Sequence, residues 1–441
     1  MRILFTTYPE RTHFLLMAPL AWALRTAGHE VRVASQPKFA DTITRAGLTA
    51  VPVGPDRDLW QILTRDPSWL GQGDSGDSPP PYDAAGREPE DIGWEYLRDG
   101  YAQQVERWHK TSNVPMTADL VAHARAWRPD LVIWEPVTYA GAIAAKAVGA
   151  AHARLLFGID VYGVTRDHFL RLRARQPEDR RQDPLADWLG GYARKYGGEF
   201  DEEMITGQFT VDLVPEILQR RAERTYVPLR YVPYGGPATV PRWLWEKPAR
   251  PRIALTLGLS GTGHGGGYDV GVQGVLDALA GLDVEVVATI AEAEQHRLER
   301  VPERARLVPF VPLDALTATC DVVVHHGGMG TLATTALRGL PQLTLPWDTD
   351  EPLLAAGITG AGAGLTLNPK QATVGEVRDA VARLLTEPEF RAGAARLRDR
   401  FLAAPTPNDL VPELERLVSE HRTRGPGPAA AAPRPAAPRK G

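Results

Sequence analysis

The chain has 441 residues, a length that exceeds one ordinary hydrophobic core and predicts two domains. Its formal net charge of −4 gives no argument for nucleic acid or for an anionic membrane surface as a partner. Cys320 is the single cysteine, which excludes an intrachain disulfide and favours a cytoplasmic location.

The first half of the chain alternates strand and helix patterns. Strands are predicted at 3–7, 31–34, 50–53 and 130–134, and helices at 15–26, 41–46 and 140–148. This order is typical of a doubly wound α/β domain with a parallel sheet. The segment 71–91 predicts a long mobile loop, and the charged segment 166–181 predicts a solvated helix. The small-residue run 140–151 contains Lys146 and is too short to span a membrane.

The same alternation restarts after a proline-rich segment at 226–251, which predicts a stiff interdomain linker. Strands are then predicted at 253–257, 284–289, 321–324 and 341–346, and helices at 272–279 and 332–338. We therefore expect a first domain at 1–225 and a second at 252–405. The last residues, 423–441, are mostly Pro, Ala, Gly and basic residues and predict a disordered tail.

The most informative motif is a glycine-rich turn from strand to helix in the second half. It consists of His325, His326, Gly327, Gly328, Met329, Gly330 and Thr331. Such a turn brings backbone N–H groups to a helix N-terminus and forms an anion site suited to a diphosphate. Because neighbouring strand residues face opposite sides, only His326 is expected to contact the phosphates, and His325 is expected to pack. The polar, acidic loop 347–351 follows the next strand, so the ligand is expected to carry hydroxyls as well. A nucleotide-sugar fits this description.

A second glycine-rich loop, 257–266, follows the strand at 253–257. We interpret Ser260, Gly261 and Thr262 as further diphosphate donors that face the first turn across a cleft. The alternative is a flexible surface loop. A dinucleotide fingerprint, G-x-G-x-x-G, is also satisfied here, but further glycines delay the helix that should follow. A hydrolase nucleophile elbow would need glycine at position 262.

His13 and Glu135 are the candidate catalytic pair of the first half. His13 is expected in the loop after the first strand, and Glu135 ends the strand at 130–134. Ligands of open α/β sheets bind at the carboxyl ends of strands, so the two side chains could meet in one cleft. A helix N-terminus would keep His13 neutral as a base, and a carboxylate would orient it. The alternative is that His13 caps or packs against the helix and that Glu135 is solvated.

These motifs resemble those of a known family. The chain is similar to inverting glycosyltransferases with two Rossmann-like domains that face a cleft (GT-B), above all to actinobacterial enzymes that attach deoxysugars to macrolides and related polyketides. The similarity runs from residue 1 to about 422. It rests on the segments 11–14, 19–34, 128–132, 149–154, 230–234 and 325–331.

The resemblance implies transfer of a deoxysugar from a dTDP-sugar to a hydroxyl of a polyketide aglycone, with inversion. His13 would be the general base and Glu135 its partner, at a position where relatives often carry Asp. The resemblance also places Phe310 and Val311 at the nucleotide base and Trp347 and Asp348 at the sugar. A C-terminal helix at 406–422 would return to the first domain.

The remaining expectations concern other groups and partners. We expect no cofactor and no metal, because the helix N-terminus already supplies positive potential for the diphosphate. Some relatives need a cytochrome-P450-like helper protein, and the sequence leaves open both that need and the oligomeric state, with a homodimer as one option. Two other function classes stay open: a catalytically idle partner protein of another transferase, and an NAD-dependent or epimerase-like Rossmann enzyme.

Overall fold

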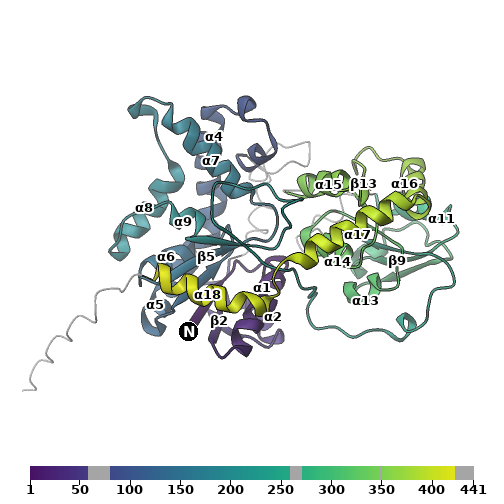
Figure 1. Ribbon diagram of the computed structural model, residues 1–441, viewed down its shortest axis with the longest axis horizontal. Helices are drawn as coiled ribbons and strands as arrows, with labels where there is room; N and C mark the ends of the chain where they lie inside the picture. The colour runs from purple at the N-terminus through teal and green to yellow at the C-terminus, as the bar shows by residue number, and fades with distance from the viewer. Residues whose placement is uncertain (58–79, 259–270, 348–349, 423–441) are drawn as a thin grey trace, which may run out of the picture.

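The computed structural model describes residues 1–57, 80–258, 271–347 and 350–422. Two parallel sheets organise these residues into two lobes (Figure 1). The first sheet has seven strands in the order β3-β2-β1-β4-β5-β6-β7, and the second has six in the order β10-β9-β8-β11-β12-β13. In both sheets the strand order reverses direction beside the first strand of the domain, which is the arrangement of a doubly wound fold.

The first sheet contains β1 (Arg2–Thr6), β2 (Glu30–Ser35), β3 (Thr49–Pro52), β4 (Leu131–Trp134), β5 (Ala151–Leu155), β6 (Phe209–Asp212) and β7 (Tyr226–Pro228). Its helices are α1 (Arg11–Thr26), α2 (Ala40–Arg45), α4 (Trp94–Gln104), α5 (Lys110–Trp127), α6 (Ala140–Lys146), α7 (Val161–Ala174), α8 (Pro184–Tyr196) and α9 (Glu203–Thr206). All four residues of β4 are buried, because helices cover both faces of a central parallel strand.

The second sheet contains β8 (Arg252–Thr256), β9 (Glu285–Thr289), β10 (Ala305–Val308), β11 (Val322–His325), β12 (Gln342–Thr344) and β13 (Gly364–Thr366). Its helices are α11 (Val272–Ala280), α12 (Glu292–Gln295), α13 (Leu313–Thr317), α14 (Met329–Leu337), α15 (Glu351–Gly360), α16 (Val374–Thr386) and α17 (Pro388–Ala403). An apolar cluster from β8, β9, β11, β12, α11 and α16 forms the core on one face of this sheet.

The last helix, α18 (Pro407–His421), leaves the second lobe and packs against α1 and β5 of the first (Figure 1). Thr406 and Asp409 form a capping box that starts it, and Glu415 lies 3.2 Å from His29 Nε2. The two lobes also meet at Tyr231, whose hydroxyl donates to the Gly330 carbonyl at 3.1 Å. Tyr231 of the linker therefore contacts the glycine-rich turn of the second lobe, while α18 returns to the first lobe.

Three sequence predictions about the fold are wrong in part. Residues 226–228 form β7, paired with β6, and not the start of the linker. The segment 71–91 was predicted as one mobile loop, but its residues 82–86 and 89–91 form short 3-10 helices and Tyr82 is buried. Residues 71–79 of that segment lie outside the described residues. Arg166 was expected on a solvated helix but is fully buried, because Asp183 and Glu202 bind its guanidinium at 2.7 and 2.6 Å. The predicted disordered tail, 423–441, also lies outside the described residues.

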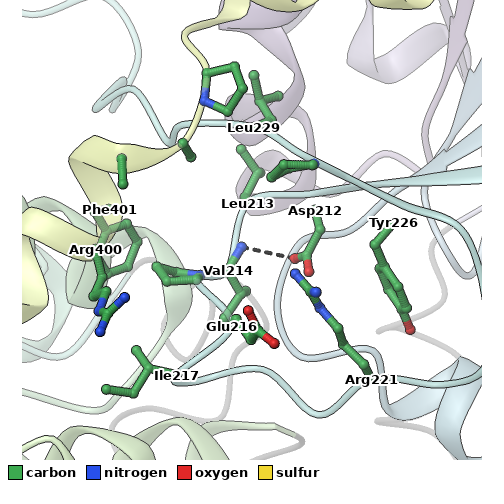
Figure 2. A pocket seen from close by; sticks show the side chains of 15 residues that line it. Asp212, Leu213, Val214, Glu216, Ile217, Arg221, Tyr226, Leu229, Arg400 and Phe401 are labelled. Carbon is green, nitrogen blue, oxygen red and sulfur yellow. Dashed lines mark hydrogen bonds between the residues drawn. The ribbon is translucent and has the colours of Figure 1, made fainter.

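A cavity of about 570 Å³ lies where β6, β7 and the end of α17 meet (Figure 2). Asp212, at the end of β6, lines it together with Arg221 and Phe401. The Asp212 carboxylate accepts a hydrogen bond from the Val214 amide at 2.9 Å, drawn as a dashed line in Figure 2. This cavity is formed by residues other than those of the candidate active site.

Candidate active site

His13 lies in the first turn of α1, not in the loop where the sequence prediction placed it. The helix begins earlier than predicted because Glu10 caps it, accepting a hydrogen bond from the Thr12 amide at 3.1 Å. Strands β1 and β4 pair with Thr6 opposite Trp134. The residues that follow the two strands therefore share one edge of the sheet, and His13 meets Glu135 there.

The His13 Nδ1 atom lies 3.8 Å from Glu135 Oε1, an ion-pair distance that is longer than a hydrogen bond. Glu135 is fully buried, so the alternative of a solvated carboxylate is excluded. Three donors hold it: the Val137 amide at 2.9 Å, the Tyr8 amide at 3.3 Å and the Thr138 hydroxyl. These bonds fix the direction of the carboxylate toward the imidazole.

The charge state of His13 follows from a competition between burial and nearby carboxylates. Burial lowers the pKa of His13, but Glu135, Glu10 and Asp350 together outweigh this effect, and the pKa is raised above its usual 6.5. The expectation that the helix N-terminus keeps the imidazole neutral is therefore wrong in direction. His13 accepts a proton more readily than an ordinary histidine, and it is free to do so only above its raised pKa.

Phe157 completes the surroundings of His13, and the sequence analysis missed it. The two rings are stacked with centroids 3.9 Å apart and planes within 5°. Phe157 follows β5, the neighbour of β4, so the rule that sites gather at carboxyl ends of strands could have found it. The imidazole is thus held at one edge by Glu135 and across one face by Phe157.

The glycine-rich turn joins β11 to α14 in the second sheet. Gly327 has a φ of 109°, a conformation that favours glycine, and α14 begins at Met329. His325 is buried and packs as expected: its Nε2 lies 2.8 Å from Gln342 Oε1, and its Nδ1 accepts from the Gly327 amide at 3.1 Å. Burial lowers the pKa of His325 to about 3, so this histidine is neutral and structural.

His326 faces the other way, with its ring nearly perpendicular to that of His325. Burial lowers its pKa to about 4, so it is a neutral imidazole at pH 7. A Cβ at Gly258 or Gly328 would lie within 2.6 or 2.4 Å of the His326 ring, so both glycines make room for it. Glu351, which the sequence analysis did not select, lies with Oε1 3.4 Å from His326 Nε2 and accepts the Trp347 amide at 3.2 Å.

The remaining predicted site residues have mixed outcomes. Ser260, Gly261, Thr262 and Asp348 lie outside the described residues. Phe310 is 41% exposed, whereas the Val311 side chain is buried in an apolar cluster. Within the glycine-rich turn, the Thr331 amide already donates to the Gly328 carbonyl at 3.1 Å, so it is not available to an anion. Among the residues that the structure describes, the amides of residues 328–330 have no backbone acceptor and can face a ligand, since the first N–H groups of a helix lack intrahelical partners.

The two halves of the site approach each other through Asp350, which directly precedes α15. Its carboxylate accepts a hydrogen bond from the Ile159 amide of the first domain at 2.8 Å. Among the residues that the structure describes, no three His, Cys, Asp or Glu side chains gather where they could hold a metal ion. Within the same residues, no helix is both long enough and apolar enough to cross a membrane.

Two family models match the chain, one at residues 22–258 and one at 273–417. They describe the N-terminal and C-terminal domains of erythromycin biosynthesis protein CIII-like proteins. The chain belongs to this family. It is 45% identical to 10-deoxymethynolide desosaminyltransferase of Streptomyces venezuelae over 96% of the chain and 98% of that protein. It is 44% identical to tylactone mycaminosyltransferase of Streptomyces fradiae over 96% of the chain and 93% of that protein.

The family assignment agrees with the architecture. The crystal structure of glycosyltransferase VinC in complex with dTDP superimposes with a TM-score of 0.84 and 41% identity, covering 95% of this chain and all of VinC. The prediction of two parallel-sheet domains of the GT-B type is confirmed. This family member is a glycosyltransferase, and the two relatives are named for desosaminyl transfer with 10-deoxymethynolide and for mycaminosyl transfer with tylactone.

Proposed function

We propose that this glycosyltransferase moves a deoxysugar from a dTDP-sugar to a hydroxyl of a macrolide-like polyketide aglycone, with His13 as general base and inversion at the anomeric carbon. The observation that carries the proposal is the His13–Glu135 pair, 3.8 Å apart in one sheet edge, with the glycine-rich turn on the other domain. The chain is 45% and 44% identical to the desosaminyl and mycaminosyl transferases over 96% of its length, which supports a deoxysugar donor and a macrolide-like acceptor.

The geometry supports a single displacement. The Nδ1 atom of His13 faces Glu135, which leaves Nε2 for the acceptor hydroxyl. As the acceptor oxygen attacks the anomeric carbon, its proton passes to Nε2 and the bond from that carbon to the diphosphate oxygen breaks. Glu135 stabilises the resulting imidazolium without taking its proton. One displacement on the face opposite the leaving group inverts the anomeric centre.

The leaving dTDP needs stabilisation of its developing negative charge. The amides of residues 328–330 and the start of the α14 dipole supply it at the glycine-rich turn. His326 is neutral at pH 7, so it contributes a hydrogen bond and not a full positive charge. The proposal therefore includes no cofactor and no metal, and activity is expected to survive a chelator such as EDTA.

The test is a transfer assay with dTDP-desosamine or dTDP-mycaminose as donor and 10-deoxymethynolide or tylactone as acceptor. Each assay is run with and without a cytochrome-P450-like helper protein, because some relatives resembling this chain need one. The expected result is a glycoside whose anomeric configuration, measured by NMR coupling constants, is opposite to that of the donor. A glycoside with the configuration retained contradicts the displacement. Failure of dTDP to raise the melting temperature, with NAD⁺ raising it instead, contradicts the donor class.

A further inference from the structure

The loop that carries Phe157 contacts both the proposed base, His13, and the second domain. It runs from the end of β5 to the start of α7, and Phe157 stacks on His13 at a centroid distance of 3.9 Å. Two residues later, the Ile159 amide donates to Asp350 Oδ2 of the second domain at 2.8 Å. A short path of direct contacts thus leads from the second domain to the imidazole of His13.

The loop is anchored differently on its two sides. At its end, Asp160 is buried, paired with Arg154 at 2.7 Å, and its amide donates to Gln219 Oε1 at 3.0 Å, all within the first domain. Between this anchor and Phe157, the Ile159 amide donates its hydrogen bond to Asp350 in the second domain. On the other side of the ring, the Leu156 amide donates to the Val211 carbonyl of β6 at 3.0 Å. Phe157 therefore lies between a first-domain anchor at residue 156 and the contact of residue 159 with the second domain.

Gly158 shows how closely the carboxylate approaches. A Cβ placed at Gly158 would lie 1.9 Å from Asp350 Oδ2, much closer than two such atoms can come. Its φ is not in the left-handed region, so the backbone itself would tolerate alanine there. A side chain at residue 158 would therefore have to displace the Asp350 carboxylate.

We propose that Phe157 is a positioning residue for the base His13, and that Asp350 of the second domain holds it in place through the Ile159 amide. This inference rests on the proposed role of His13 in proton transfer. Its consequence is that the base is fully aligned only while the two domains are in this arrangement. The imidazole is then aligned to take the acceptor proton only when the donor-binding domain is docked, which would restrict deprotonation of the acceptor to the docked state.

Phe157 is tested by replacing the ring face. Phe157→Leu keeps an apolar side chain but removes the flat surface, and turnover should fall by roughly 10- to 100-fold, the range expected when a reacting group is misplaced by about 1 Å. Phe157→Tyr keeps the flat stacking face and should retain most of the wild-type turnover. The affinity for dTDP, measured by calorimetry, should stay at the wild-type value in both variants, because Phe157 belongs to the other domain. A loss of dTDP affinity equal to the loss of turnover would show a general structural role and overturn the proposal.

Asp350 is tested by a double-mutant cycle with Gly158. Gly158→Ala should lower turnover by displacing the loop, and Asp350→Ala should lower it by releasing the Ile159 amide. In the double variant the clash is gone, so its turnover should match that of Asp350→Ala alone and not the product of both losses. Asp379→Ala removes an exposed carboxylate of α16 and should leave turnover unchanged.

The outcomes separate this inference from the function on which it rests. If His13→Ala abolishes transfer but the losses of Gly158→Ala and Asp350→Ala multiply, the base assignment stands and the interdomain positioning is wrong. If His13→Ala transfers sugar at a nearly normal rate, the proposed mechanism fails first. Circular dichroism on each variant checks that it is folded, and Phe157→Tyr keeps the test informative if Phe157→Leu does not fold.

Discussion

The carboxylate of Glu351 lies 3.4 Å from Nε2 of His326, beside the turn proposed to hold the donor diphosphate. Because burial lowers the pKa of His326 to about 4, the imidazole is neutral at pH 7. A diphosphate that binds at the turn must therefore approach a carboxylate as well as the amides of α14. We infer that Glu351 limits the affinity for free dTDP while it orients His326.

Glu351→Gln should consequently bind dTDP more tightly at pH 7, by roughly tenfold or about 1.4 kcal/mol, since it keeps the hydrogen-bonding shape and removes like-charge repulsion. Isothermal calorimetry measures the change. Glu389→Gln, an exposed position on α17, is the matched control and should bind as the wild type does. His326→Ala should weaken dTDP binding. If Glu351→Gln weakens binding to the same extent as His326→Ala, the carboxylate supports the ligand and the repulsion argument is wrong.

Removing the imidazole of His13 should reduce turnover by roughly 10²- to 10⁴-fold, as expected for loss of a general base. The dTDP affinity should barely change, because the proposed diphosphate site lies on the other domain. Glu135→Gln should show a smaller loss, since Glu135 orients the imidazole and stabilises its charged form. Steady-state rates with the cognate aglycone, and with a helper protein where one is needed, measure both effects. A His13→Ala enzyme with nearly normal turnover would revive the helix-packing interpretation of this histidine.

The pH dependence of transfer should report the pKa of His13. The base is active when unprotonated, so kcat/KM should rise with pH and level off above the raised pKa, which lies above 6.5. Glu135 is the largest contribution that raises this pKa, so Glu135→Gln should move the acidic limb to lower pH even though the plateau falls. Asp350→Asn should also move the acidic limb to lower pH, but by less, because Asp350 contributes less than Glu135 to the raised pKa of His13. An acidic limb that stays in place in Glu135→Gln would show that another group controls it.

The sequence could predict the parts of the fold that local patterns determine. The strands at 31–34 and 130–134 and the turn at 325–331 carry continuous apolar runs or glycine signals, and β2, β4 and α14 lie there. The start of α1 was missed because Glu10 is an uncommon cap, so His13 was placed in a loop. Burial of Arg166 was unpredictable, because its two acidic partners come from distant segments of the chain.

The candidate site likewise contains residues that the sequence could predict and residues that it could not. His13, Glu135 and the glycine-rich turn could be selected because strand ends and strand-to-helix turns mark the ligand edge of a parallel sheet. Phe157, Glu351 and the role of Asp350 depend on how close two loops or two domains come, which no spacing along the chain encodes. The contact between Asp350 and the Ile159 amide joins residues 191 positions apart. Such contacts decide the charge and orientation of His13 and His326, so their pKa shifts could not be predicted from the sequence.

The cavity at the domain junction supplies a test of stability that is independent of catalysis (Figure 2). Asp212 is 2% exposed, its Oδ1 accepts bonds from the Val214 amide and Gln219, both at 2.9 Å, and its Oδ2 has no hydrogen-bond partner among the described residues. Burial raises the pKa of Asp212 to about 7, against 3.8 for an ordinary aspartate, because two hydrogen bonds do not offset the loss of water.

A raised pKa in the folded state makes stability fall as the pH rises. The folded protein holds the Asp212 proton up to about pH 7, whereas the unfolded chain releases it near pH 4. The contribution is therefore complete below pH 4 and lost as the pH rises to about 7, with a total on the order of 4 kcal/mol. Asp212→Asn keeps an oxygen acceptor and cannot ionise, so its stability should exceed that of the wild type by more at pH 8 than at pH 5. Urea unfolding at both pH values measures this difference, with Asp379→Asn as the exposed control. Parallel stability curves for wild type and Asp212→Asn would mean that Asp212 is ionised in the folded protein throughout this range.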